Sequence, residues 1–430
     1  MVGGMEWKRW RKRLLGLSRL GYRAGERTRV LLPRRRSPMR GVYEQAVLHD
    51  AYSVRARLVQ RAARLFIQPV LRFTPLNDRT IRAMRSLDRV AARGPRSRYV
   101  EPIGYELGGV CVESMTHRFG PTSDMTILYF HGGGFFSGSI DSHRRICEAL
   151  ARLTGANVIS VDYVQLPDGS VADSVQDVIR AYEGLLEITL DPDKIVVAGD
   201  SAGGYLSMKV AELATRRRLQ APAAILLFSP LLSLDPERHD KAVERIDPVN
   251  DAYLPPKKMA KIRKLWNPAG SSIEGFASPL HASAYINSPV FMTAVEDEML
   301  RPEGEAMSLL MADRGIEVDT HIWRKQVHAF PVMAGLLPES RHALRLAADF
   351  ARIAVGELER EVAEEPAGFA PVDDHLLADE VWLDETDVDS FEDGETLVGE
   401  IVQPGPAPEE EILEGEFVDD RRGARFPRVS

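Results

Sequence analysis

Short apolar runs alternate with longer amphipathic stretches through the middle of the chain. Five of these runs are rich in β-branched and aromatic residues and too short for buried helices, so each predicts a strand. They lie at residues 125–130, 158–161, 195–198, 290–295 and 318–323. After the third run, residues 205–218 carry apolar side chains at helical spacing. Strands that alternate with helices predict an α/β domain, in which helices flank a mostly parallel sheet.

The third strand-like run ends in the sequence GDSAGG at residues 199–204, which is too small and glycine-rich to continue a strand. A strand, a tight turn and a helix form the context of a G-x-S-x-G nucleophile elbow, so Ser201 is the candidate nucleophile. Gly199 and Gly203 leave room for the strand and the helix to pass closely. The N–H of Ala202 begins the helix and is a candidate donor to the oxyanion of an acyl-transfer reaction.

The sequence HGGG at residues 131–134 follows the first strand-like run. Successive glycines allow backbone N–H groups to approach a substrate carbonyl oxygen, so Gly133 and Gly134 are candidates for the other oxyanion donors. We expect His131 and Gly132 to support this loop rather than to react. Asp200 is expected to make a structural hydrogen bond beside the nucleophile.

A serine nucleophile requires a base and an acid, which this layout presents in the order Ser, Asp or Glu, His. The fourth strand-like run ends in three acidic residues, at the carboxyl end of a strand where such folds gather their chemistry. Of these, Asp297 and Glu298 are both candidates for the acid. His328 lies in the loop just after the fifth run, between apolar residues, and is the candidate base.

In their residues and in their order, these motifs resemble those of the hormone-sensitive lipase-like family of α/β-hydrolases, also called bacterial family IV esterases. The matching segments are HGGGFFSGS, DYVQLPD, DPDKIVVAGDSAGGYLSM, ASPL and VHAF, within residues 100–355. The resemblance implies the α/β-hydrolase fold, cofactor-free hydrolysis of carboxylic esters, and a triad of Ser201, an acid and His328. Aligned without a gap, the family pattern Asp-Pro-Leu-Arg-Asp-Glu-Gly places Glu298 at the acid, with Asp297 as the alternative.

We therefore expect a serine carboxylesterase or lipase that acts on short- to medium-chain acyl esters of small molecules or lipids through an acyl-enzyme. The alternatives are an acyltransferase or amide deacetylase with the same triad, and a non-catalytic binder of small ligands. No cofactor and no metal are expected. The two cysteines, Cys111 and Cys147, have neither a disulfide framework nor the spacing of a metal site, which favours a cytoplasmic protein.

Charge is distributed unevenly along the chain, whose formal net charge is −8. Residues 1–99 hold 25 Lys and Arg against 6 acids, whereas residues 355–430 hold 24 acids against 5 bases. Together with the motifs, this predicts four parts. They are a basic amphipathic extension (1–40), a helical cap (41–99), an α/β-hydrolase catalytic domain (100–355) and an acidic, disordered tail (356–430).

The sequence of residues 1–40 is compatible with two structures. Trp7, Trp10, Leu14 and Leu17 share one helical face, so this segment could lie on an anionic membrane surface or pack as an ordinary helix. A nucleic-acid partner is not expected, because the basic residues have little aromatic interleaving and form no known motif. No apolar run approaches the roughly 18 residues of a membrane span, so membrane contact would be peripheral.

Overall fold

The computed structural model describes residues 46–91, 100–235 and 251–359. The expected basic extension of residues 1–40 lies outside these residues, as does the acidic tail beyond residue 359.

A nine-stranded sheet forms the centre of the described part, in the order β1-β9-β8-β7-β6-β4-β5-β3-β2. β3 is antiparallel to both of its neighbours, β2 and β5, and every other pair is parallel. All five runs predicted as strands are present, as β4, β5, β6, β8 and β9, and the mostly parallel sheet is confirmed. The strands are β1 (Ala46–His49), β2 (Val100–Leu107), β3 (Val110–His117), β4 (Thr126–Phe130), β5 (Asn157–Val161), β6 (Ile195–Asp200), β7 (Ala224–Phe228), β8 (Val290–Val295) and β9 (Val318–Trp323).

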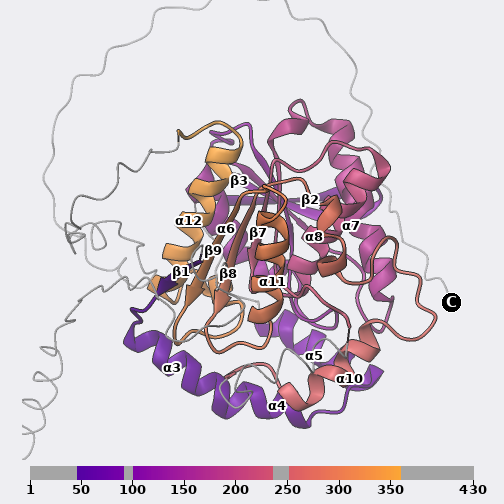
Figure 1. Ribbon diagram of the computed structural model, residues 1–430, viewed down its shortest axis with the longest axis vertical. Helices are drawn as coiled ribbons and strands as arrows, with labels where there is room; N and C mark the ends of the chain where they lie inside the picture. The colour runs from indigo at the N-terminus through magenta and orange to yellow at the C-terminus, as the bar shows by residue number, and fades with distance from the viewer. Residues whose placement is uncertain (1–45, 92–99, 236–250, 360–430) are drawn as a thin grey trace, which may run out of the picture. The chain divides into compact units, whose positions relative to one another are not determined.

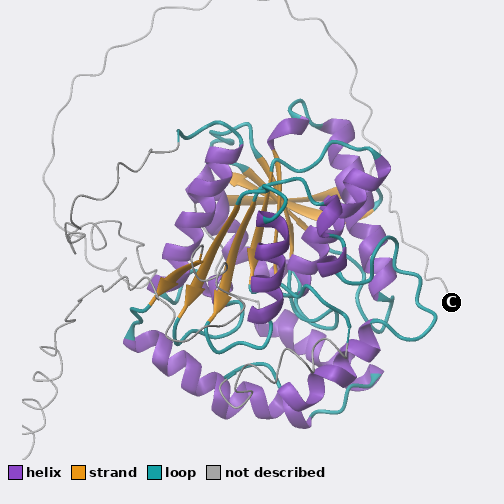
Figure 2. Cartoon of the chain, viewed as in Figure 1, coloured by secondary structure: helices purple, strands orange, loops and turns teal. Residues whose placement is uncertain are grey.

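Helices cover both faces of the sheet (Figure 2). Neighbouring side chains of β8 show the two layers, because successive residues of a strand point to opposite faces. The Phe291 ring lies 5.9 Å from the ring of Phe350 in α12, whereas Met292 lies against Gly304 in α11. α6 packs with α12, and α8 packs with α7. The helices of the two layers are α6 (Ile140–Thr154) and α12 (Pro338–Ala354) on one face, with α7 (Val171–Ile188), α8 (Ala202–Arg217) and α11 (Arg301–Ala312) on the other.

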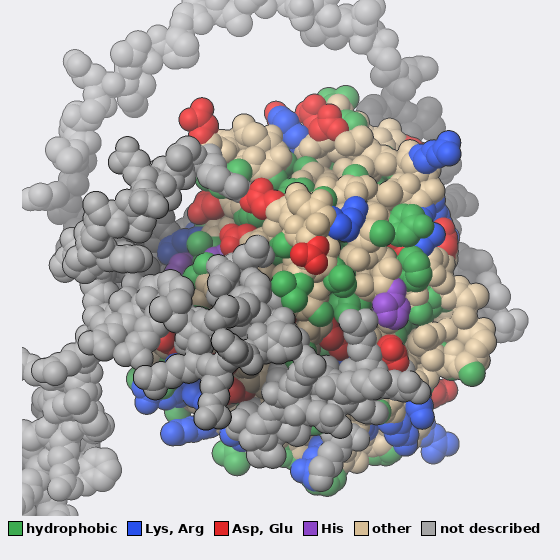
Figure 3. Space-filling model, in the orientation of Figure 1, with side chains coloured by type: hydrophobic (Ala, Val, Ile, Leu, Met, Phe, Trp, Pro, Cys, Tyr) green, Lys and Arg blue, Asp and Glu red, His purple; other side chains and the backbone are tan. Residues whose placement is uncertain are grey.

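A second group of helices crosses the carboxyl ends of the parallel strands (Figure 1). α3 (Val54–Ala62), a π-helical turn (Ala63–Ile67) and α4 (Gln68–Phe73) follow one another without a break, and α5 (Asp78–Ala91) comes next. These helices lie in the segment where a helical cap was expected. α10 (Pro256–Trp266) lies beside them, although it comes from the connection between β7 and β8. Lys and Arg side chains are frequent along this rim of the molecule (Figure 3).

The segment expected to be only cap also contributes a strand to the sheet. β1 pairs in parallel with β9, in a register that sets Ala46 beside Thr320 and His49 beside Trp323. The His49 and Trp323 rings stack at 3.8 Å with an angle of 6° between their planes. The sheet therefore begins before the expected catalytic boundary at residue 100, because an edge strand can be supplied from a distant part of the chain.

None of the helices within the described residues combines the length and the apolar character that crossing a membrane requires.

Candidate active site

Ser201 occupies a strained turn between β6 and α8. Its backbone has φ 51° and ψ −114°, a conformation that non-glycine residues rarely adopt. Glycines on either side permit this turn, because a Cβ on Gly203 would overlap the carbonyl oxygen of Phe130 in β4. The same is true of Gly199, where a Cβ would overlap the backbone of Gly203. The turn therefore lifts the Ser201 hydroxyl clear of the sheet, as a nucleophile elbow does.

Hydrogen bonds join Ser201, His328 and Glu298 in a row. Ser201 Oγ lies 2.8 Å from His328 Nε2, and His328 Nδ1 lies 2.9 Å from Glu298 Oε2. The second carboxylate oxygen of Glu298 accepts the backbone N–H of Val295 at 2.9 Å, which fixes the orientation of the acid. Because the carboxylate accepts the Nδ1 proton, Nε2 is left to accept the Ser201 proton. These are the contacts that activation of a serine requires.

Asp297, the alternative acid, faces a different partner. Its carboxylate lies 3.5 Å from Lys325 Nζ, at the partly exposed side of the turn. Glu298 and His328 are both buried, at 2% and 7% exposure. The structure thus brings Glu298, and not Asp297, to the imidazole.

The electrostatic surroundings of His328 favour its protonated form. Burial alone would lower the pKa of His328, but the hydrogen bond and the charge of Glu298 outweigh it, so the pKa is raised above the usual 6.5. The nearby Asp251 carboxylate acts in the same direction. The raised pKa means that these surroundings stabilise the imidazolium that would form when the serine proton is taken up.

The glycines of the loop after β4 differ in what their backbone faces. Gly132 N–H donates to Asp200 Oδ1 at 2.9 Å and is therefore occupied. Gly133 and Gly134 line the cavity in front of Ser201, in backbone conformations of φ 109° and 65°. Ala202 is the first residue of α8, where a helix leaves its N–H groups without intrahelical partners. Two of the three expected oxyanion donors, Gly133 and Gly134, thus line the cavity, and the third directly follows Ser201 in the chain.

Asp200 is buried within a polar network behind the glycine loop. Besides Gly132, it accepts the Tyr129 hydroxyl at 2.8 Å and lies 3.4 Å from His143 Nε2. Burial alone would lower the pKa of His143, but the Asp200 carboxylate raises it above the usual value. The hydrogen bonds of Asp200 tie the loop after β4 to the nucleophile turn after β6, which agrees with the structural role expected of it.

His131 is also fully buried and is not among the residues that line the cavity. Its ring stacks on Tyr163 at 4.5 Å, and the Tyr163 hydroxyl donates to the His131 carbonyl oxygen at 2.7 Å. Complete burial and the neighbouring His143 lower the pKa of His131 to about 3, so the ring is neutral. The geometry agrees with support of the loop, which is the role expected from the sequence.

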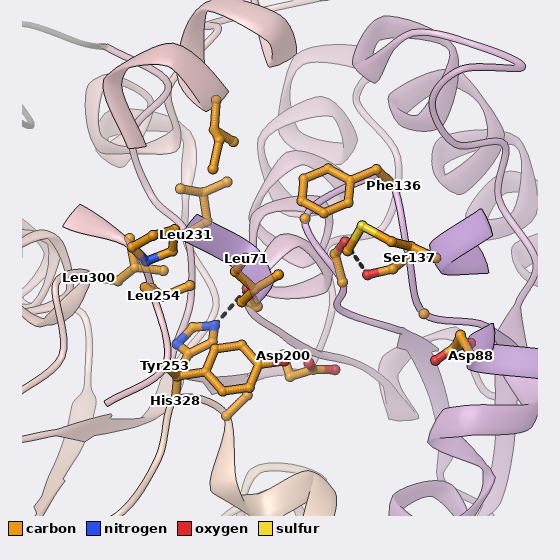
Figure 4. A pocket seen from close by; sticks show the side chains of 18 of the residues that line it. Leu71, Asp88, Phe136, Ser137, Asp200, Leu231, Tyr253, Leu254, Leu300 and His328 are labelled. Atoms are coloured by element: carbon orange, nitrogen blue, oxygen red, sulfur yellow. Dashed lines mark hydrogen bonds between the residues drawn. The ribbon is translucent and has the colours of Figure 1, made fainter. Parts of the chain in front are cut away.

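A cavity of about 290 Å³ opens in front of Ser201 and His328. Its walls are mainly apolar and come from the cap helices and from the loops after β7 and β8 (Figure 4). The Tyr253 ring lies beside His328, with 5.8 Å between the ring centroids. Side chains from the two parts include Leu71, Met84, Leu231, Leu254, Met259 and Ile262.

Several supporting residues were not anticipated from the sequence. Asp251 accepts the N–H groups of Tyr253 and Leu254 at 2.8 and 2.9 Å, and its other oxygen accepts Met299 N–H at 3.0 Å. It thereby ties the cavity wall to the residue that follows Glu298. No local motif marks this aspartate, because its partners are distant in the sequence.

The sequence does not mark the roles of Ser229, Arg263 and Glu303 either, because their partners are also distant along the chain. Ser229, directly after β7, accepts Ala329 N–H at 3.2 Å and so holds the loop of His328. The guanidinium of Arg263 in α10 contacts Glu303, whose carboxylate also accepts two backbone N–H groups of the loop after β7. Glu303 belongs to the family pattern that aligned the acid, and that pattern was the one available signal. Within the described residues, no group of His, Cys, Asp and Glu is arranged to hold a metal ion.

Known proteins share this architecture. Residues 127–332 match the family described as alpha/beta hydrolase fold. The esterase LipU of Mycobacterium tuberculosis is 32% identical over 240 residues, which cover 54% of this chain and 78% of LipU. An acetyl-hydrolase of Streptomyces hygroscopicus is 28% identical over 232 residues, covering 54% of this chain and 77% of that protein. The crystal structure of an esterase from the bacterial hormone-sensitive lipase family has 25% identity and a TM-score of 0.62, covering 71% of this chain and all of that one.

A mostly parallel sheet that carries a serine on the turn after a central strand defines the class of α/β-hydrolases with a nucleophile elbow. The chain belongs to the α/β-hydrolase family, in its hormone-sensitive lipase-like branch. The expected fold class and the expected enzyme class, a carboxylic ester hydrolase, are thereby confirmed.

Proposed function

We propose that this protein is a serine carboxylesterase that hydrolyses short- to medium-chain acyl esters through an acyl-enzyme, with Ser201, His328 and Glu298 as its triad. The observation that carries the proposal is the unbroken row of hydrogen bonds from Ser201 Oγ through His328 to Glu298, at 2.8 and 2.9 Å. The apolar cavity beside it supports an uncharged acyl group as the substrate part that is buried.

In the first half of the reaction, Ser201 Oγ attacks the ester carbonyl carbon while His328 Nε2 takes its proton. The negative charge that develops on the carbonyl oxygen is stabilised by the N–H groups of Gly133, Gly134 and Ala202. His328 then donates its proton to the leaving alcohol, which departs and leaves the acyl group on Ser201. Glu298 keeps the imidazole in the required tautomer throughout.

In the second half, water repeats the same steps and releases the carboxylic acid. His328 takes a proton from the water as its oxygen attacks the acyl-enzyme carbonyl. The proton returns to Ser201 Oγ when the bond between Oγ and the acyl carbon breaks. No group outside the triad and the three backbone donors is required for either half.

The size of the cavity supports the chain length. Pockets that enclose small molecules typically measure about 300–1,000 Å³, and this cavity, at about 290 Å³, lies at the lower end. The name of one similar protein, an acetyl-hydrolase, supports the short end of this range. Esters of small molecules or of lipids are both compatible with an apolar wall.

The test is hydrolysis of p-nitrophenyl esters from acetyl to palmitoyl by the wild type and by Ser201→Ala and His328→Ala. We expect turnover to be greatest for short and medium chains and to fall at least a thousandfold in both variants. If the wild type hydrolysed none of these esters, a ligand-binding role would replace the proposal. If Ser201→Ala kept its activity, the assigned nucleophile would be wrong.

We separately propose that the protein is cytoplasmic and that residues 1–40 contact an anionic membrane peripherally. The basic amphipathic pattern of that segment supports this proposal. Flotation of the full chain with anionic liposomes, compared with a variant in which Trp7 and Trp10 are replaced by serine, tests it. Equal partition of the two proteins would refute it.

A further inference from the structure

The outward side of the helical segment of residues 54–73 exposes large apolar side chains. Six of them are between 55% and 73% exposed, although side chains of this kind are usually buried. The opposite side of the same segment packs on the body of the protein, where Ala56 and Ala63 are each 1% exposed. The exposed six are Val54, Leu58, Leu65, Phe66, Val70 and Phe73.

These side chains form one stripe rather than scattered points. Their spacing along the chain is mostly three, four or seven residues, which places them on one side of a helix. We call this stripe, together with the exposed arginines that flank it, the outer cap face. The arginines are Arg57, Arg61, Arg64 and Arg72.

The charge of this face is of one sign. Residues 54–73 contain five arginines and no Asp or Glu. Lys261 and Lys264, on the neighbouring α10, are also exposed. Apolar and basic side chains alternate along the rim formed by α3 and α4 (Figure 3). Bulky apolar residues flanked by arginines, without acids, are the composition of helices that lie in the interface of an anionic bilayer.

The position of the outer cap face relates it to the cavity. Leu71, between Val70 and Phe73, turns inward and lines the cavity, so one helix carries both surfaces. α3 and α4 also lie along the outer edge of the described part of the molecule (Figure 1), and a helix at such an edge can reach a deformable lipid surface.

We propose that the outer cap face docks on an anionic phospholipid surface and brings the mouth of the cavity to that surface. The apolar stripe enters the headgroup region, and the flanking arginines contact lipid phosphates. This inference goes beyond the proposed function and does not depend on it, because docking involves no catalytic residue. Ser201→Ala should therefore bind vesicles as the wild type does, whether or not the proposed hydrolysis is correct.

The chain provides a matched pair of sites for the test. The Arg72 guanidinium lies 5.2 Å from the Phe73 ring centroid, and that of Arg118 lies 5.7 Å from the ring centroid of Phe119. Phe119 is 85% exposed. It follows β3, which is antiparallel to β5, so it lies at the amino ends of the parallel strands, opposite the cap. The same double substitution can therefore be made on the outer cap face and away from it.

The experiment is flotation of the full chain with vesicles of phosphatidylcholine alone or mixed with phosphatidylglycerol. The variants are Phe66→Ser, Arg72→Glu/Phe73→Ser and the control Arg118→Glu/Phe119→Ser. We expect the wild type and the control to bind the anionic vesicles, less so at high salt. The cap variants should lose at least tenfold in partition, since each arginine near an anionic surface contributes about fivefold and removal of a Phe side chain from water contributes at least about tenfold. Unchanged circular dichroism and unchanged hydrolysis of p-nitrophenyl acetate in buffer would show that the variants are folded.

Three outcomes would overturn the proposal. The first is a wild type that stays with neither kind of vesicle, and the second is cap variants that partition like the control, which would assign any binding to another segment. The third is a concentration-dependent dimer, seen by light scattering, that only the cap variants abolish while vesicle binding is unaffected. In that case a second copy of the chain, and not a membrane, covers the outer cap face.

Discussion

Replacing Glu298 by glutamine tests the assignment of the acid with little change in shape. In the wild type, Glu298 Oε1 accepts Val295 N–H at 2.9 Å, and Oε2 faces His328 Nδ1 at 2.9 Å. A backbone N–H can be satisfied only by the oxygen of the new amide. The NH₂ group of the introduced glutamine would therefore turn toward the imidazole.

That orientation reverses the tautomer of His328. An NH₂ group donates, so Nδ1 must accept and Nε2 must carry the proton, which leaves no acceptor for the Ser201 hydroxyl. A change of this kind in a serine triad lowers kcat about ten-thousandfold. At about 1.36 kcal/mol per tenfold, the loss is about 5.4 kcal/mol of transition-state stabilisation. The free energy of unfolding should change much less, because the bond to Val295 is kept.

The assay is the pH dependence of kcat/KM with p-nitrophenyl acetate, for Glu298→Gln and for the matched control Asp297→Asn. The control should remain within about threefold of the wild type, because it removes only a partly exposed ion pair with Lys325. Activity needs neutral His328 and is lost as the pH falls through its pKa. Loss of the Glu298 charge lowers this pKa, so the acid limb of the residual activity should move to lower pH.

The reasoning would be refuted by the reverse ranking of the two variants. If Asp297→Asn lost a thousandfold or more and Glu298→Gln stayed within tenfold, the acid would be Asp297, and the turn after β8 would adopt another conformation during catalysis. An acid limb that did not move in Glu298→Gln would show that the carboxylate does not act on the imidazole.

Three further predictions concern the supports of the site. Arg263→Met should lower the free energy of unfolding by about 3–5 kcal/mol in urea titrations, because it leaves the Glu303 carboxylate buried without its counter-charge. For His131, whose pKa falls from 6.5 to about 3 on folding, the unfolded chain takes up a proton before the folded one does, so stability is lost as pH falls below 6.5. This loss is about 2 kcal/mol at pH 5, and His131→Gln should abolish that part of the pH dependence. Trp266→Phe removes the 2.7 Å bond to the Gly134 carbonyl oxygen and should lower kcat up to tenfold, which stopped-flow turnover would measure.

The parts of the fold that are determined by consecutive residues could be predicted from the sequence. β6, the GDSAGG turn and α8 follow one another within residues 195–217, so local pattern and turn chemistry suffice to place Ser201. The helix begins at Ala202 rather than at Tyr205, because the small residues of the turn also adopt helical conformation. His328 and Glu298 could be proposed because each lies in the loop that follows a strand.

Features that depend on contacts between distant residues could not be predicted. β1 pairs with β9 across more than 270 positions, as the bond between His49 and His321 shows. α10 belongs to the connection between β7 and β8 and lies beside the cap helices. Its sequence pattern does not indicate that it packs there. Asp251 and Ser229 have ordinary neighbours in the sequence, and only the tertiary structure shows that they hold the loops of Glu298 and His328.

These distant contacts join the cap to the catalytic loops. From α10, Trp266 Nε1 donates to the carbonyl oxygen of Gly134, and the buried Arg263 contacts Glu303 at the start of α11. Asp251, just before α10, accepts the N–H of Met299 beside the acid. A displacement of α10 would therefore reach both the loop of the proposed oxyanion donors and the loop of Glu298, since each is hydrogen-bonded to α10 or to the residues before it. The helices that cover the carboxyl ends of the strands consequently shape the cavity and also fix the positions of the proposed catalytic groups.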